Sequence, residues 1–191
     1  RLALYFLVCF TACLPVAAAG MQSNWIGDPS IGEARLISAV TASGDLEKLP
    51  LGLEFRLAPG WKIYWRTPGE AGLPPRIDLL AGGDPVESQI KWPVPKRFNA
   101  FGFDNYGYDN TVILPLDVSG FAAGTTLQLT GQVEVLACAE ICVPLGGTVK
   151  ITMPAGPALA SADARAMAQA VALVPRQGGN ASLVPDRLWQ V

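Results

Sequence analysis

Glycine and proline are spread along the whole chain, and this distribution constrains its fold more than any other feature. There are 20 Gly and 16 Pro among 191 residues. Both residue types interrupt helices and favour turns, so long helices have little uninterrupted sequence in which to form. Half of the residues are apolar, which is enough for a buried core in a chain of this length. The composition therefore favours an all-β fold of short strands joined by turns.

Alternating apolar and polar residues predict strands that recur about every ten residues, a spacing typical of a β-sandwich. The predicted strands cover residues 34–42, 51–57, 76–80, 90–92, 111–118, 126–136 and 148–153, with one more beginning at Trp61. We interpret Trp61, Tyr64 and Trp65 as core and strand-packing residues. Residues 93–109 are expected to be a long irregular segment rich in aromatic side chains, and loops of that length are usually functional or mobile.

The two ends of the chain differ from its middle. Residues 1–19 are interpreted as a signal peptide truncated at its start, because an apolar run ends in small residues that suit signal-peptidase cleavage. A membrane anchor, or a lipoprotein attached through Cys13, are the alternatives. Residues 20–155 hold the predicted strands and form the main domain. Residues 156–191 are predicted to be a linker, a helix capped by Ser161 and ended by Pro175, and the start of a further segment.

Charge and composition exclude several classes of function. The net charge is only −2 and no basic stripe occurs, so neither nucleic acid nor an anionic membrane surface is an expected partner. The chain has no histidine, which excludes Ser-His-Asp triads, Cys-His pairs and histidine-containing zinc sites. Four cysteines remain, and Cys9 and Cys13 would leave with the signal peptide. The exported chain would keep Cys138 and Cys142 in an oxidising compartment, where they can persist as a disulfide.

Cys138 and Cys142 are four positions apart, in the connection between two predicted strands. Four residues of extended chain span roughly 13 Å, whereas a disulfide needs Cα atoms about 4.4–6.8 Å apart, so the chain must turn if the cysteines bond. Closing so short a loop contributes only about 2 kcal/mol of stability, and short disulfides in turns are often exchangeable. We therefore favour thiol–disulfide exchange. The alternatives are a structural cross-link, a non-redox interaction module, and an envelope copper-handling domain that binds Cu(I) through the two thiolates.

The chain resembles the N-terminal periplasmic domain of the DsbD family of thiol:disulfide interchange proteins, and most closely its ScsB branch. The resemblance rests on four segments in a fixed order: GWKIYWRTPGEAGLPP (60–75), WPVPKRF (92–98), YGYDNTVILPLDV (106–118) and LACAEICVP (136–144). DsbD proper has a longer gap between its two cysteines. The CxxxC spacing of this chain therefore points to the ScsB branch.

This resemblance implies an immunoglobulin-like β-sandwich acting as a thiol:disulfide oxidoreductase of the protein-disulfide reductase type. Cys138 and Cys142 would be its catalytic pair, and no cofactor or metal is expected. An aromatic cap loop would shield the disulfide, with Phe101 at the cap position and Phe103 as the alternative, unless both are simply loop anchors. Glu140, which lies between the cysteines in a stretch without a cation, disfavours thiolate formation and is a candidate for tuning the pair.

The resemblance also implies two partners and a location. A membrane-embedded redox domain would donate electrons, and a periplasmic thioredoxin-like or disulfide isomerase-like protein would accept them. The protein would be periplasmic, exported by its signal peptide, and tethered to the inner membrane in its full-length form. The present chain would be one domain of that larger electron relay.

Overall fold

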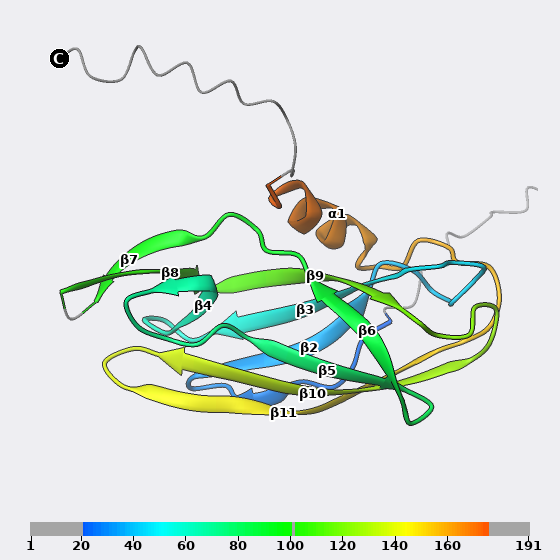
Figure 1. Cartoon of the computed structure of the whole chain (residues 1–191), viewed down its shortest axis with the longest axis horizontal. Coiled ribbons are helices and arrows are strands. Elements are labelled where there is room, and N and C mark those ends of the chain that lie inside the picture. Colours follow the sequence, from blue (N-terminus) through cyan, green and yellow to red (C-terminus); the bar gives the residue numbers. More distant parts are fainter. Residues whose placement is uncertain (1–20, 101, 176–191) are drawn as a thin grey trace, which may run out of the picture.

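A computed structural model of the chain describes residues 21–100 and 102–175 (Figure 1). The predicted signal peptide, the cap candidate Phe101 and the predicted segment after Pro175 lie outside the described residues. The elements, in chain order, are β1 (Ile26–Asp28), β2 (Gly32–Ser38), β3 (Leu49–Leu57), β4 (Lys62–Gly69), β5 (Arg76–Ala81), β6 (Asp84–Ile90), β7 (Lys96–Ala100), β8 (Phe103–Asp109), β9 (Thr111–Ser119), β10 (Leu127–Cys138), β11 (Cys142–Met153) and α1 (Ala164–Ala172).

The strands form two layers, as the sequence predicts. One layer contains β1, β2, β3 and β9, and the other contains β4, β5, β7, β8, β10 and β11. All of these neighbours pair antiparallel. Strand β6 pairs with β9 of the first layer and with β5 of the second, so it joins the two layers at one edge. In Figure 1 the β7–β8 hairpin and the turn between β10 and β11 lie at the same end of the sandwich.

Apolar side chains from both layers fill the space between them. In β3, the alternating residues Leu51, Leu53 and Phe55 are fully buried, as their sequence pattern predicts. In the opposite layer, five alternating residues of β10 belong to the same core: Leu127, Leu129, Val133, Val135 and Ala137. Full burial of such a side chain contributes about 1.5–3 kcal/mol. The core therefore fixes which residues of β10 point inward and which point to the outer face.

Several predicted elements are corrected by the structure. Residues 93–109 are not one irregular segment, because most of them form the β7–β8 hairpin. Its aromatic residues favour strands, but β8 buries side chains on both of its faces, so the segment lacks a simple alternating pattern. The predicted strand at 90–92 lies earlier, as β6, and the short strand β1 was not predicted.

The single helix of the described residues, α1, is shorter than the predicted 162–174. Asp163 occupies the N-cap position, and its backbone N–H donates to the hydroxyl of Ser161, the predicted cap. The helix lies on the outer face of the first layer (Figure 1). Met167 meets β3 at Gly52, since a Cβ built on this glycine would lie 2.5 Å from the Met167 sulfur. With nine residues, α1 is too short to cross a membrane.

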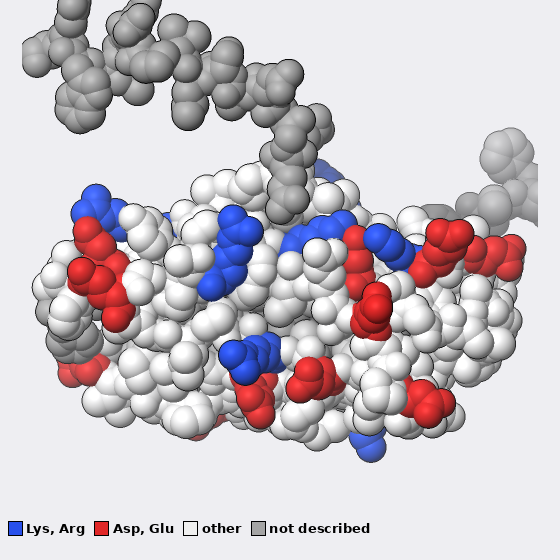
Figure 2. All heavy atoms as spheres, viewed as in Figure 1, with Lys and Arg blue, Asp and Glu red and all other residues white. Residues whose placement is uncertain are grey.

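Charged side chains are mixed over the surface. On the face drawn in Figure 2, acidic and basic residues lie in small groups that are separated by wide uncharged areas. Arg35–Glu54 and Arg97–Asp104 are ion pairs across neighbouring strands, and Lys91, just after β6, pairs with Asp117 of β9. This mixture agrees with the small net charge of the sequence.

Candidate functional site

The two cysteines close the outer end of the β10–β11 hairpin. Each residue of β10 pairs with a residue of β11, from Leu127 opposite Met153 to Cys138 opposite Cys142. Three residues make the turn, and the N–H of Ala139 donates to the carbonyl of Ile141 (2.9 Å). The sulfurs of Cys138 and Cys142 are bonded, with Cα atoms 4.0 Å apart, slightly closer than the usual range because the two residues face each other across the strand pair. The chain thus turns between the cysteines, as their spacing requires, and both strands reach further toward the pair than the sequence predicts.

The two cysteines differ sharply in exposure. Cys138 is 2% exposed, whereas Cys142 belongs to the exposed residues. The turn beside Cys142 is also open, with Ile141 68% exposed and Glu140 exposed. A thiol approaching the tip of the hairpin therefore meets Cys142 first.

Cys138 is buried although it does not point into the core. Strand β10 directs Val133, Val135 and Ala137 inward, so strand alternation directs Cys138 to the outer face. Accordingly, Cys138 is not a member of the core cluster. Its burial must come from groups that lie on the outer face of the second layer.

A loop, residues 70–75, connects β4 to β5 and folds over that outer face. Its Gly72 lies on the ring of Tyr64, since a Cβ built there would be 2.5 Å from two ring carbons. Tyr64 is 5% exposed and is also outside the core cluster, unlike its inward neighbour Ile63. Tyr64 is buried, as expected for a strand-packing residue. It packs on the outer face of the layer, beneath the 70–75 loop, and not within the core cluster.

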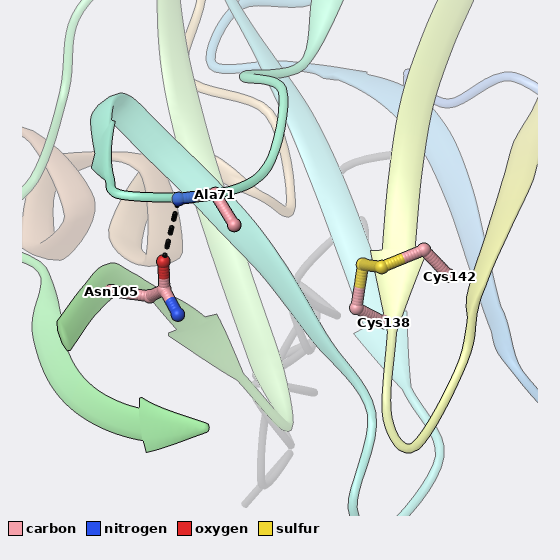
Figure 3. The surroundings of a disulfide bond; sticks show 4 residues. All are labelled: Ala71, Asn105, Cys138 and Cys142. Carbon is pink, nitrogen blue, oxygen red and sulfur yellow. Dashed lines mark hydrogen bonds between the residues drawn. A yellow bond between two sulfur atoms is a disulfide. The ribbon is translucent and has the colours of Figure 1, made fainter. Parts of the chain in front are cut away.

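Asn105 of β8 holds this loop in place. Its side chain is 2% exposed, and its Oδ1 accepts a hydrogen bond from the N–H of Ala71 (3.2 Å). Figure 3 shows that Ala71 lies between Asn105 and the disulfide, with its side chain on the disulfide side. Neither Asn105 nor the loop stood out in the sequence as part of a site. The available signals were an asparagine within an aromatic strand and two glycines close together before a Pro-Pro pair.

A groove of about 590 Å³ begins at the end of this loop. Leu73 and Pro74 of the loop line this groove together with residues of both hairpin strands, among them Leu136 and Pro144. Leu136 and Pro144 are each two residues from a cysteine. The loop therefore extends from Tyr64 to the immediate surroundings of the disulfide.

The structure also places a cation beside Cys138, which the sequence did not suggest. Lys62 of β4 lies opposite Cys138 of β10 in the strand ladder. On the other side of β4, Lys62 lies opposite Asp109 of β8. The ammonium of Lys62 lies 5.5 Å from the ring centre of Phe98. Asp109 also forms an ion pair with Lys96. The row that starts at Cys138 therefore carries one positive side chain, Lys62, and one negative side chain, Asp109.

The pKa values of two groups near the site shift for clear reasons. Burial under the 70–75 loop raises the pKa of the Tyr64 phenol, because the charged form loses its hydration. In the residue before Asn105, hydrogen bonds from Arg97 of β7 lower the pKa of the Asp104 carboxyl. The Arg97–Asp104 pair joins β7 to β8 and is exposed to solvent.

The remaining predicted site residues have the following positions. Phe103, at the start of β8, is 48% exposed, and the other cap candidate, Phe101, is outside the described residues. Trp61 and Trp65 are partly buried against the core, as predicted. Nowhere in the described residues do three or more cysteine, aspartate or glutamate side chains gather as they would around a metal ion.

Comparisons with known proteins agree with this arrangement. The sequence pattern of the family described as "Thiol:disulfide interchange protein DsbD, N-terminal" matches residues 33–154. The fold is similar to the crystal structure of the N-terminal periplasmic domain of ScsB from Proteus mirabilis, with a TM-score of 0.66 and 27% sequence identity. The match covers 84% of this chain and 62% of that one. No match was found among curated proteins.

The ScsB domain supports the immunoglobulin-like form of the sandwich, and the family match includes the hairpin that carries both cysteines. The chain spans about 62% of the length of the ScsB structure. This chain belongs to the family of DsbD N-terminal domains, the thiol:disulfide interchange domains whose ScsB branch its sequence resembles.

Proposed function

We propose that this chain is a periplasmic thiol:disulfide oxidoreductase domain in which Cys138 and Cys142 carry reducing equivalents between two protein partners. The observation that supports this most directly is the disulfide at the tip of a hairpin, with one exposed and one buried cysteine. The short loop adds little to stability, and the exposed member offers an incoming thiolate a point of attack. The family match supports the same class of reaction.

The exposure difference supports a proposal of separate roles for the two sulfurs. A thiolate of the donor attacks the sulfur of Cys142, the disulfide breaks, and Cys138 leaves as a thiolate that takes up a proton. The second thiolate of the donor then attacks its own sulfur in the mixed disulfide and releases Cys142. The donor ends as a disulfide and the domain as a dithiol, so two electrons have moved.

Passing the electrons on reverses these roles. The thiolate of Cys142 attacks a disulfide of the acceptor and forms a new mixed disulfide. The thiolate of Cys138 then attacks the sulfur of Cys142, which restores the intramolecular bond and releases the acceptor as a dithiol. Cys142 is therefore the sulfur that contacts both partners, and Cys138 is the resolving sulfur.

The chemistry of the site and the family resemblance support two proposed partners. The proposed donor is a membrane-embedded redox domain, and the proposed acceptor is a periplasmic thioredoxin-like or disulfide isomerase-like protein. The ScsB domain with the similar fold is itself described as periplasmic. Export by the predicted signal peptide would bring this chain to the same compartment.

Trapping of the mixed disulfide tests the proposal. The Cys138→Ser variant keeps the exposed thiol of Cys142 and removes the resolving thiol, so it should accumulate a covalent adduct with an oxidised thioredoxin-like protein. The adduct should run as one band on a non-reducing gel and disappear with reductant. The matched Cys142→Ser variant should give far less adduct, because Cys138 is buried.

Two outcomes would contradict the proposal. If neither variant forms an adduct, and the intact disulfide is inert to protein dithiols, the pair is a structural cross-link. If Cys142→Ser forms adducts as readily as Cys138→Ser, the assignment of roles to the two sulfurs is wrong.

Glu140 is the proposed tuning residue, since it lies in the exposed turn between the cysteines. Its carboxylate opposes formation of a second negative charge on a nearby sulfur. The Glu140→Gln variant should therefore lower the pKa of the Cys142 thiol in the reduced domain. The rate of Cys142 alkylation, followed as a function of pH, reports that shift, and an unchanged profile would exclude the tuning role.

A further inference from the structure

Three residues on adjacent strands are buried on the outer face of the second layer. They are Asn105 of β8, Tyr64 of β4 and Cys138 of β10, with exposed fractions of 2%, 5% and 2%. None of them belongs to the core cluster, and an outer-face residue is ordinarily accessible to solvent. One cover that spans these three strands would explain all three burials.

The 70–75 loop has the contacts to be that cover. It begins at β8, where Gly69 pairs with Asn105 and the N–H of Glu70 donates to the carbonyl of Asp104 (3.5 Å). It is bonded to Asn105 through Ala71. It crosses Tyr64 at Gly72, and it ends at the groove beside Leu136 and Pro144 of the cysteine hairpin.

The path of β4 delivers the loop to this position. Tyr64 lies opposite Gly107, and Gly69 lies opposite Asn105. Between these two positions β4 advances by five residues and β8 by only two, so the extra residues of β4 bulge out of the ladder. Gly69 and Gly72 have φ angles of +103° and +107°, which side chains rarely tolerate. A Cβ on Gly69 would lie 2.3 Å from the carbonyl oxygen of Asp104. The two glycines thus allow the loop to lie flat on the sheet.

We propose that the 70–75 loop, fastened by Asn105, is a wall that shields Cys138 and so restricts attack on the disulfide to Cys142. Asn105 is then a positioning residue, which acts on the cysteine pair only through the loop. This wall lies on a different connection from the aromatic cap candidates Phe101 and Phe103. The inference rests on the proposed exchange function for its purpose, but the access that it predicts can be measured without any exchange reaction.

The test measures the accessibility of Cys138 alone. In the Cys142→Ser chain, the only other described cysteine is absent, and alkylation of Cys138 by iodoacetamide is followed by peptide mass spectrometry. The rate is taken at the high-pH plateau, so that a change in the pKa of the thiol does not enter. The added substitution Gly72→Ala should displace the loop from Tyr64 and raise the rate on the order of tenfold, because a larger fraction of molecules has the loop open.

Gly83→Ala is the matched control. Gly83 lies in the turn between β5 and β6 with a φ of +104°, almost the same as Gly72, but a Cβ there meets nothing within 4 Å. The control therefore carries the same backbone strain without a collision against Tyr64. It should leave the alkylation rate of Cys138 unchanged.

Asn105 provides a second route to the same result, which is decisive if Gly72→Ala fails to fold. Asn105→Ala removes the acceptor for the N–H of Ala71 and should also raise the rate. Asn105→Asp retains an acceptor oxygen at the same place and should restore slow alkylation. Equal rates in the folded Asn105→Ala, Asn105→Asp and Gly83→Ala chains, with circular dichroism confirming the fold, would overturn the proposal.

The two proposals fail in different ways. If iodoacetamide detects the loop effect but the intact disulfide does not react with protein dithiols, the wall exists and the exchange function is wrong. If the disulfide exchanges readily but the loop variants leave Cys138 equally buried, the exchange function stands and the wall is wrong.

Discussion

Opening the disulfide should weaken the domain only slightly. The bond closes a loop of five residues, Cys138 to Cys142, and the chain-entropy relation gives about 2 kcal/mol for a loop of that size. The hairpin does not depend on the bond for its register, because β10 and β11 pair along their full length of 12 residues each. For a domain of this size, about 2 kcal/mol corresponds to a fall in Tm of roughly 4–8 °C.

The measurement compares the oxidised chain, the chain reduced with excess reductant, and the double variant with both cysteines changed to serine. Urea unfolding followed by tryptophan fluorescence gives the free energy of unfolding for each. The reduced chain and the double variant should agree and remain cooperatively folded. A loss above about 4 kcal/mol, or an unfolded reduced chain, would refute the reasoning, because removal of a structural disulfide typically has an effect of that size.

Three further predictions test other parts of the structure. Burial raises the pKa of Tyr64, so its ultraviolet phenolate titration should have a midpoint above the ordinary value. The stability that the neutral phenol contributes is present below pH ~10 and is lost as the pH rises through the raised pKa. A midpoint at the ordinary value would contradict burial under the loop. Ser161→Ala should lower the free energy of unfolding, measured in urea, by about 1–2 kcal/mol. The Ser161 hydroxyl donates to the carbonyl of Ser38 and accepts from the N–H of Asp163. No change would mean that these bonds do not anchor α1. Phe55→Ala should cost about 3–5 kcal/mol, since Phe55 is fully buried, and a loss below 1 kcal/mol would place it outside the core.

The regular part of the fold was predictable because one physical rule governs it. Strands such as β3 bury one face and expose the other, so their alternation appears directly in the sequence. The β7–β8 hairpin escaped prediction because β7 is a mostly exposed edge strand, whereas β8 lies between β4 and β7 and buries side chains on both of its faces. Its burial pattern is set by what packs on it, including the 70–75 loop, and that packing is not encoded in any local period.

The candidate site divides in the same way. The need for a turn if Cys138 and Cys142 bond followed from their spacing, since the geometry of a disulfide is fixed. Their role as the exchanging pair rested also on the family resemblance. The contacts of Asn105 with Ala71 and of Tyr64 with Gly72 could not be found this way, because they depend on the register shift in β4. Lys62 was missed for a different reason: it is distant from Cys138 in sequence and becomes its neighbour only through strand pairing.

The pairing of β10 with β11 has a kinetic consequence. Since the cysteines are the last pair of a continuous ladder, breaking the sulfur–sulfur bond leaves the two thiols facing each other, held there by the strands. Each thiol then sees the other at a high effective molarity, so a mixed disulfide should be resolved from within faster than by a second molecule in solution. The hairpin would therefore favour transfer of electrons in pairs, with single-thiol adducts existing only briefly.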